Sequence, residues 1–433
     1  RRELQGVVED VVAGPRSPWA LREARLPDRE RLTVGHLWVW TERTTWNPVG
    51  GFGDVYSVDI WRNLHDPPLW NHPFTGRPEP LRASFTVETR GPEGKLPVPP
   101  DAVRWNAEAD RWEPVGPGVG ATSRVVFDYS RYVGTRWHHG QPITMADALY
   151  AMAQAYELAY DPDKVRIETA LGITARPFLE TFRGYRVLGE DRLEVYVDFW
   201  HFDPNYIAQY ASPAGFGMPW ELLYAMDDLV FQQRRAAYSD TAAGRFNVTW
   251  LSLVMERDAQ LVRRTLRQLE RQAPVPRGVF EVGGTSLVSP QEAAARYRAA
   301  LDWFERYGHF VISNGPFLLA RYDPPAQFAE LRAFRDPAYP FRAGDWQFGP
   351  PPRLAFGQVT APRVRPGQPA TVRVSVEGPG QVGLRYLLLD PATGQVVVQG
   401  EARPEGRAFL VELPAEVTSG LWPGVYRLYV AAH

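Results

Sequence analysis

The chain of 433 residues contains no cysteine, which excludes disulfides, thiolate catalysis and cysteine-ligated metal sites. Lysine is nearly absent: Lys95 and Lys164 are the only two among 48 basic residues, and arginine makes up the rest. Because the basic residues are scattered and the formal net charge is -2, bulk charge favours neither nucleic acid nor an anionic membrane surface as a partner. No apolar run approaches the roughly 20 residues that cross a bilayer, so any export signal or anchor is expected upstream of Arg1.

Patterns typical of catalytic, metal or cofactor sites are also missing. His138 and His139 are adjacent, but neighbouring residues on a strand point to opposite faces and no further ligand stands at suitable spacing, so no metal is predicted. The glycine-rich residues 50–54 lack the lysine of a phosphate loop and the third glycine of a dinucleotide motif. Three acidic residues are interpreted as a solvated helix face rather than a catalytic pair: Glu221, Asp227 and Asp228. We expect no enzyme activity and no cofactor.

A Gly-Pro-Pro-Pro run at residues 349–352 is predicted to separate two domains. Before it, over residues 32–348, strand and helix patterns interleave irregularly, which favours an α/β lobe with a mixed sheet. After it, over residues 353–433, short strand-like runs separated by turn signals favour an Ig-like or fibronectin-like β-sandwich without a disulfide. Residues 1–31 carry an apolar helical stripe and are predicted to be the helical tail of an upstream element.

Local patterns predict several elements of the first domain. Apolar and polar alternation predicts strands at residues 31–40, 125–129 and 193–199. Helical periodicity predicts helices at residues 220–235, 252–271 and 289–307. The last of these has a capping box of Ser289 and Glu292 and ends at Gly308. The segment 91–118, rich in Gly and Pro, is predicted to be a long ordered loop or an inserted hairpin.

Residues 137–148 read W-H-H-G-Q-P-I-T-M-A-D-A and join a strand end, a glycine turn and a helix start. Thr144 and Asp147 can form a capping box at that start. This stretch resembles the signature W-H-D-G-x-P-[LV]-T-A-x-D-V of the extracellular solute-binding proteins of peptide-type (peptide/nickel, family 5) ABC importers. It departs from the signature at three positions, with His139 for Asp, Met145 for Ala and Ala148 for Val.

Two further segments resemble the same family in the same order. Residues 313–323, S-N-G-P-F-L-L-A-R-Y-D, resemble its G-T-G-P-Y-x-L-x-x-Y strand, and R-D-P-A-Y at 335–339 resembles its R-N-P-x-Y. Residues 69–81, with P-F-T-G-R-P-E-P, are similar more weakly to the T-G-x-x-x-P segment that leads into the first lobe's sheet. The resemblance covers residues 32–345, but the large second lobe that follows the G-P-Y strand in the family has no counterpart there. We therefore expect that lobe upstream, in a longer or rearranged protein.

The resemblance implies a periplasmic-binding-protein-like lobe that serves as the substrate-binding component of an ABC importer. Such a component captures an oligopeptide-like solute outside the cell or in the periplasm and delivers it to a membrane permease with its ATPase. Contact with the membrane would come only through the permease or through an anchor outside this chain. The identity of the ligand stays open between a peptide, an oligosaccharide and a metal chelate.

Aromatic residues in polar loops are the candidate ligand contacts, because their faces offer large contact area at little cost in side-chain entropy. The resemblance places Trp46, Asn47 and Tyr56 beside the cleft, and Asn314 and Phe317 near the hinge strand. Trp61, Trp200 and Trp220 are chosen on their chemistry alone.

The alternative function is a secreted carbohydrate-active enzyme or carbohydrate-binding module, since Trp-rich clefts followed by a β-sandwich suit glycans. The enzyme would require two facing carboxylates, for which the sequence offers no convincing pair. A third alternative, an extracellular adhesion scaffold, predicts no cleft at all.

Overall fold

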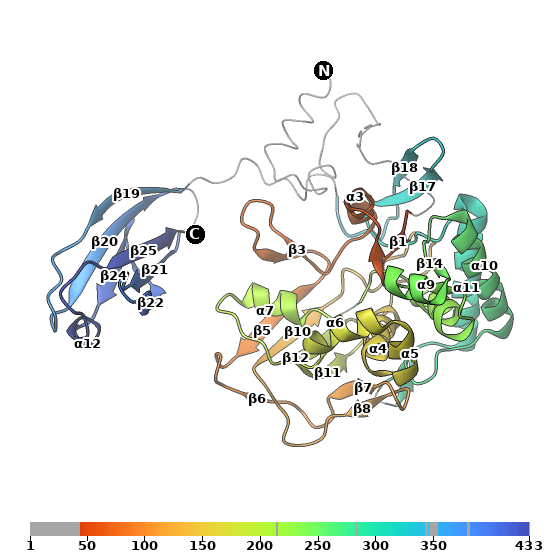
Figure 1. Ribbon diagram of the computed structural model, residues 1–433, viewed down its shortest axis with the longest axis horizontal. Coiled ribbons are helices and arrows are strands. Elements are labelled where there is room, and N and C mark those ends of the chain that lie inside the picture. Colours follow the sequence, from red (N-terminus) through yellow and green to blue (C-terminus); the bar gives the residue numbers. More distant parts are fainter. Residues whose placement is uncertain are drawn as a thin grey trace, which may run out of the picture. The chain divides into compact units, whose positions relative to one another are not determined.

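The computed structural model describes residues 44–213, 215–282, 284–342, 345, 354–378 and 382–432. The chain divides into two compact units, Arg1–Gln347 and Phe348–His433 (Figure 1). It is of mixed α/β class, with many antiparallel sheets. The helical tail predicted at 1–31, the strand predicted at 31–40 and the connector predicted at 349–352 lie outside the described residues. Among the described helices, none has both the length and the apolar character to span a membrane.

A six-stranded sheet is the largest of the first unit, in the order β5-β10-β12-β11-β7-β8. Its strands are β5 (Ser84–Thr89), β7 (Val103–Asn106), β8 (Arg111–Pro114), β10 (Ser123–Asp128), β11 (Phe182–Leu188) and β12 (Arg192–Val197). β10 and β12 confirm the strands predicted at 125–129 and 193–199. Every pairing in this sheet is antiparallel, in place of the predicted mixed sheet. The physical reason is local: β7–β8 and β11–β12 are hairpins, which need no crossover helix.

The β7–β8 hairpin lies within the Gly- and Pro-rich segment 91–118 and confirms the inserted hairpin. Trp105 and Trp112 stand opposite each other on it, with ring centroids 5.2 Å apart in an edge-to-face arrangement. Each indole N–H is paired: that of Trp105 donates to Glu157, and that of Trp112 donates to the Val279 carbonyl at 2.9 Å. Both rings can therefore be buried without losing a hydrogen bond.

Shorter strands and the helices complete the first unit. The strand pairs are β1 (Trp46–Asn47) with β2 (Gly51–Phe52), β3 (Leu69–Asn71) with β4 (Pro78–Pro80), β6 (Leu96–Pro97) with β9 (Gly120–Ala121), β13 (Ala236–Ala237) parallel to β14 (Thr249–Trp250), β15 (Glu281–Val282) with β16 (Thr285–Ser286), and β17 (Phe317–Asp323) with β18 (Phe328–Ala333). The helices are α3 (Val55–Leu64), α4 (Met145–Tyr160), α5 (Pro162–Ile167), α6 (Thr169–Leu179), α7 (Pro204–Ala211), α8 (Trp220–Asp227), α9 (Asp240–Phe246), α10 (Glu256–Gln272) and α11 (Pro290–Tyr307).

Helix α4 is buried along almost its whole length and packs against α5, α6 and α8. Its many alanines permit close approach of these neighbours, because small side chains leave room between helix backbones. The predicted capping box at its start is confirmed, and the Asp147 carboxylate accepts a hydrogen bond of 2.9 Å from the Thr144 backbone N–H.

The other predicted helices are present, with one displaced start. Helix α11 has the predicted Ser289–Glu292 capping box and ends at Gly308, whose φ of 75° suits glycine. Helix α8 continues as a π-helical turn, η1 (Asp228–Gln232); the two elements cover residues 220–232 of the helix predicted at 220–235. Helix α10 begins at Glu256 rather than at Ser252.

The displaced start of α10 has a tertiary cause. The Ser252 hydroxyl donates to the Thr44 carbonyl at 2.9 Å and accepts from the Trp46 backbone N–H at 3.1 Å. It therefore ties β1 to the chain before α10 and is not free to cap a helix.

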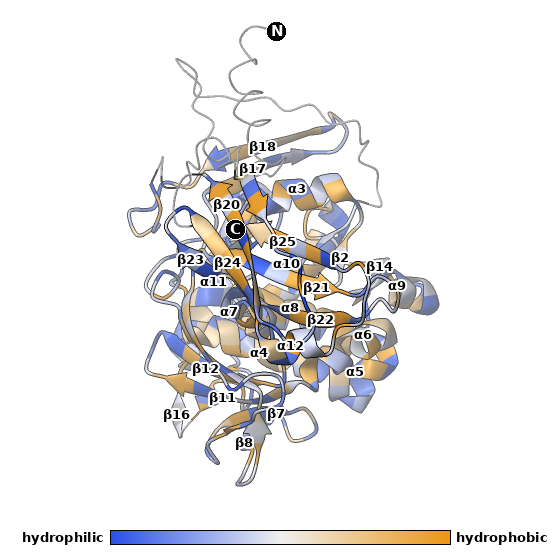
Figure 2. Cartoon of the chain, turned by 90° about the vertical axis from the view of Figure 1, so that its left-hand side faces the viewer, coloured by the Kyte–Doolittle hydropathy of each residue, from blue (hydrophilic) through white to orange (hydrophobic). Residues whose placement is uncertain are grey.

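The second unit is a small sandwich-like body of two antiparallel sheets. One sheet has the order β19-β20-β24-β23 and the other β22-β21-β25, and one short helix accompanies them. The elements are β19 (Ala355–Thr360), β20 (Ala370–Glu377), β21 (Leu384–Leu389), β22 (Val396–Glu401), β23 (Arg403–Glu405), β24 (Ala408–Leu413), α12 (Ala415–Ser419) and β25 (Arg427–Ala432). Buried and exposed residues alternate along β20. Figure 2 shows the chain coloured by the hydropathy of its residues. The strand-like runs of this domain, at residues 371–376, 384–389, 396–399, 408–413 and 425–430, are confirmed as β20, β21, β22, β24 and β25.

Candidate ligand-binding site

The turn at residues 137–141 brings the first family-like motif to the surface of the first unit. The Trp137 N–H donates to the Gln141 carbonyl at 2.9 Å, and the Gly140 N–H donates to the Trp137 carbonyl at 2.8 Å. Gly140 has a φ of 92°, which strongly favours glycine, and Trp137 anchors the turn with a fully buried ring. The imidazoles of His138 and His139 are both buried.

The His138 imidazole binds the second motif. The backbone N–H of His138 donates to the Ser313 carbonyl at 2.9 Å, and the ring nitrogen Nδ1 of His138 accepts from the Ser313 N–H at 3.3 Å. Because Nδ1 accepts, Nε2 carries the proton and donates to the Gly315 carbonyl at 3.0 Å. Burial lowers the pKa of His138 to about 4, so the ring is neutral at pH 7. Two segments that are 175 residues apart are thus locked together by one side chain.

The residues that flank the third motif reach the same place. Asp66, just before residues 69–81, accepts from the Tyr339 hydroxyl at 2.9 Å and from Arg82 at 3.3 Å. The Asn314 side-chain oxygen accepts from the Asp66 N–H at 2.9 Å, and the Asn314 backbone carbonyl accepts from Arg82 at 3.3 Å. The Asp66 and Arg82 side chains are both fully buried. We call this polar cluster the motif junction, and its members are Asp66, Arg82, His138, Ser313, Asn314, Gly315 and Tyr339.

Gly315 lets the chain pass through the motif junction. Its N–H donates to the Leu64 carbonyl at 2.8 Å, and a Cβ added here would lie 2.6 Å from the Leu64 carbonyl carbon. Only glycine fits this approach of two backbones. The Gly-Pro pair of the second motif is therefore explained by packing against the end of α3.

A second buried network lies behind the turn. Arg296 of α11 donates to Asp147 of α4, to Glu221 of α8 at 2.8 Å and to the Pro142 carbonyl at 2.9 Å. His139 Nε2 lies 2.6 Å from the other oxygen of Glu221. Burial alone would raise the pKa of Glu221, but Arg296 and His139 outweigh it and lower this pKa to about 2. The carboxylate is therefore charged and fully paired inside the protein.

The interpretation of Glu221 and its neighbours as a solvated helix face is wrong. Glu221 is 0% exposed. The Asp227 carboxylate accepts from the Tyr150 hydroxyl at 2.6 Å and from the Tyr238 hydroxyl at 2.7 Å, and burial raises its pKa. Asp228 is partly buried and accepts from Gln233 at 2.6 Å. Glu221 and Asp227 join separate elements, and nothing in the sequence near α8 reveals their distant partners.

The predicted contact residues fall into two groups. Trp46, Asn47, Trp220 and Asn314 are fully or almost fully buried and hold the fold. The Trp46 ring packs edge-on against Tyr322 of β17 at 5.8 Å, and the Asn47 side chain accepts from the backbone of its own turn. Trp220 contacts Phe280, Tyr297 and the Arg296 guanidinium. Their contact with a ligand stays a prediction.

The other four predicted residues keep more exposed surface. Tyr56 and Phe317 are half-buried, Trp61 stacks on His65 with ring centroids 5.6 Å apart, and Trp200 is 38% exposed. The structure brings Trp46 and Trp61 into one aromatic cluster through Phe52, whose ring centroid is 6.3 and 5.6 Å from theirs. Trp200 belongs to a different region, just before α7.

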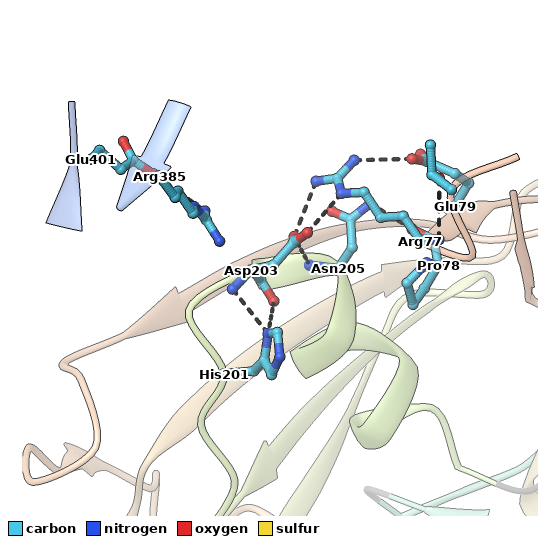
Figure 3. A network of polar contacts seen from close by, with 9 residues as sticks. Arg77, Pro78, Glu79, His201, Asp203, Asn205, Arg385 and Glu401 are labelled. Carbon is cyan, nitrogen blue, oxygen red and sulfur yellow. Dashed lines mark hydrogen bonds and ion pairs between the residues drawn. The ribbon is translucent and has the colours of Figure 1, made fainter. Parts of the chain in front are cut away.

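The region of Trp200 is anchored by an ion pair (Figure 3). The Arg77 guanidinium donates two hydrogen bonds, of 2.7 and 3.0 Å, to the Asp203 carboxylate, and it also donates one of 2.9 Å to Glu79. Asn205 donates to the Pro78 carbonyl at 2.6 Å. Asp203 also caps α7. The third motif is thereby fixed to the first turn of α7, and this pairing has a structural role.

A surface pocket of about 730 Å³ adjoins the turn on the side of α11. We call it the α11 pocket. Its wall is one face of α11, with Asp302, Trp303 and Arg306, and the remainder comes from residues 138–141, Leu318 and residues 334–336. Sequence reasoning missed Asp302, Arg306 and Arg335, because nothing local links a helix face to a segment about 30 residues later. His139, which stands where the resembling signature has Asp, is one of the residues that line this pocket.

Within the described ranges, no group of three or more potential ligand residues is arranged to hold a metal. The two adjacent histidines are each committed elsewhere, His138 to backbone atoms and His139 to Glu221. His139 Nδ1 is buried and has no hydrogen-bond partner among the described residues.

No protein-family profile matches this chain, and no curated protein matches its sequence significantly.

Proposed function

We propose that this chain is the substrate-binding component of an ABC importer for peptide-like solutes, acting outside the cell or in the periplasm. One observation carries the proposal: two of the segments that resemble the peptide-type solute-binding family, 137–148 and 313–323, are hydrogen-bonded to each other at the motif junction, where residues that flank the third segment, Asp66 and Arg82, join them. Unrelated segments with chance similarity would have no reason to share hydrogen bonds. In this proposal the first unit is a periplasmic-binding-protein-like lobe and the second an Ig-like or fibronectin-like sandwich.

The motif junction suits a protein that works by moving one body against another. It fixes the start of the β17–β18 hairpin, which in the family leads into the second lobe, to three separate parts of the first unit. A rigid attachment of this kind confines motion to the chain beyond it. Capture of solute between lobes would produce a closed form that the permease distinguishes from the open one.

The function needs no covalent chemistry from this chain. A permease and its ATPase would be the partners, and a further lobe would complete the enclosure of the ligand. The half-buried rings of Tyr56 and Phe317 lie on α3 and β17, which contact each other, and their accessible surface would contribute apolar contacts to the solute.

Native mass spectrometry of the full-length protein, purified from its source without denaturation, tests the proposal. We expect a bound small molecule that exchanges for short peptides added in excess. The matched comparison is the same protein after unfolding and refolding, which should be ligand-free and should regain peptide. A full-length protein that carries no solute, binds no peptide and hydrolyses a glycan would contradict the proposal and support the carbohydrate-active alternative.

A further inference from the structure

The α11 pocket displays charged groups that the fold does not use. Asp302 and Arg306 stand one helical turn apart on α11 and are both exposed. Arg335 is exposed in the segment after β18. Within the described part of the chain these three side chains form no ion pair, whereas most arginines near the motif junction and α8 are paired. Folding therefore gains little from them.

Asp336 completes the charged rim but is already engaged. Its carboxylate accepts from the Ala338 N–H at 2.8 Å and lies 3.8 Å from the Arg136 guanidinium. The pocket thus offers two guanidiniums and one carboxylate that form no ion pair among the described residues, from Arg306, Arg335 and Asp302; the Arg306 guanidinium lies over the Tyr307 ring, 5.1 Å from its centroid. A ligand that matches them carries at least one anionic and one cationic group.

Aromatic rings supply the apolar part of the pocket lining, beside a polar part of comparable size. The His138 ring lies edge-on to Phe334, with centroids 4.9 Å apart, and is nearly parallel to Trp303 at 6.3 Å. Trp303 in turn contacts Tyr307, with centroids 4.2 Å apart. Aromatic walls with a few polar groups at the rim are typical of small-molecule sites, and about 730 Å³ lies within their usual range of roughly 300 to 1,000 Å³.

We propose that the α11 pocket binds a zwitterionic molecule with an apolar side chain, of which a dipeptide ending in phenylalanine is the simplest example. A guanidinium pairs with a carboxylate through two parallel hydrogen bonds, so Arg306 and Arg335 take the ligand carboxylate. Asp302 takes the ammonium group, and the side chain lies against Trp303 and Phe334. The buried Nδ1 of His139, at the turn, would gain its missing partner from a polar group of the ligand. This inference rests on the proposed function and gives it a place and a chemistry.

Isothermal titration of the full chain with the dipeptide Ala-Phe tests the inference. Two blocked analogues separate the charges: N-acetyl-Ala-Phe lacks the ammonium group, and Ala-Phe-amide lacks the carboxylate. We expect each to bind at least about tenfold more weakly, since tenfold corresponds to about 1.4 kcal/mol and a charge-assisted hydrogen bond contributes at least that much. The variants Arg306→Gln, Arg335→Gln and Asp302→Asn should weaken Ala-Phe similarly.

The controls are exposed arginines on the same elements that already have partners. Arg298 on α11 pairs with Glu270, and Arg332 on β18 pairs with Glu330. Arg298→Gln and Arg332→Gln should leave the affinity for Ala-Phe unchanged. Combining Arg335→Gln with Ala-Phe-amide should cost no more than either change alone, because both remove the same contact.

Two results would overturn the inference. One is the absence of Ala-Phe binding to the wild-type chain. The other is binding that the three pocket variants leave unchanged, which would move the peptide to another surface and leave the proposed function standing. The proposed function fails by a different result, a full-length protein that carries no solute and takes up none.

Discussion

The motif junction and the α11 pocket share His138 but treat polar groups in opposite ways. At the junction, both nitrogens of the ring are hydrogen-bonded, and the buried Arg82 and Asp66 are paired with each other. In the pocket, the other side of the same turn, Arg306 and Arg335 are exposed and unpaired among the described residues. Charges that hold a fold are buried and satisfied, whereas charges kept for a ligand are exposed and left available.

Removal of the central cation of the buried network should produce the largest effect on stability. Arg296→Ala would remove the one cation that the buried carboxylates of Asp147 and Glu221 share, and breaking such a buried pair costs about 3 to 5 kcal/mol. Urea unfolding followed by tryptophan fluorescence measures the loss. The control Arg298→Ala, two residues along α11 and in a surface ion pair, should cost at most about 1 kcal/mol. If both variants lost the same free energy of unfolding, the buried charge of Arg296 would contribute no more to stability than the exposed charge of Arg298.

The close backbone approach at the junction should give the next largest effect. Gly315→Ala places a Cβ 2.6 Å from the Leu64 carbonyl carbon and should destabilise the first unit by about 1 to 3 kcal/mol, since a backbone cannot move aside as a side chain can. Gly244→Ala in α9 meets nothing within 4 Å, and helix propensity predicts a gain of about 0.5 to 1 kcal/mol. If Gly315→Ala were as stable as wild type, the chain would not be fixed at the junction.

Acidity should remove the contribution of Glu221 selectively. Its folded pKa of about 2 lies below its ordinary value of 4.5, so the charged form stabilises the fold above pH 4.5 and this contribution is lost as the pH falls towards 2. We expect Glu221→Gln to be less stable than wild type at pH 7, and the difference to shrink below pH 4.5. Unfolding free energies of both proteins between pH 2 and 7 measure it. A difference independent of pH would mean that the Arg296 pair does not act through charge.

Substitutions in the pocket should change stability least. Arg335→Gln removes an exposed charge without an ion pair in the described structure, so the free energy of unfolding should stay within about 0.5 kcal/mol of wild type. Arg306→Gln also removes the contact of the guanidinium with the Tyr307 ring and should cost at most about 1 kcal/mol. The same urea unfolding series measures it. Binding is expected to weaken in these variants, so at the pocket the affinity for the ligand would change while the stability of the fold would change little. A stability loss of several kcal/mol would show that these arginines belong to the fold.

Features that depend on nearby residues could be predicted from the sequence. The capping boxes of α4 and α11 involve residues three positions apart, and the alternation in β10 and β20 needs only one covered face. The start of α10 could not be predicted, because the Ser252 hydroxyl bonds to Thr44 and to Trp46, more than 200 residues away. Burial of Glu221 likewise depends on Arg296, 75 residues later.

The candidate site shows the same limit. Family resemblance singled out His138, His139, Asn314 and the Gly-Pro pair, which the structure brings together. Resemblance and aromatic chemistry also selected Trp46 and Trp220, which the structure buries, because a sequence does not reveal which side of a loop faces inward. The α11 pocket could not be predicted, because it forms only where one face of α11, the turn at residues 138–141 and the segment after β18 come together in the folded protein.

The most direct test of the central claim, that this chain delivers a solute to an importer, is uptake of radiolabelled short peptides by cells of the source organism. Deletion of the gene should reduce the initial uptake rate several-fold, and the wild-type gene supplied in trans should restore it. Uptake of peptides, oligosaccharides and metal chelates that is unchanged by the deletion would contradict the account.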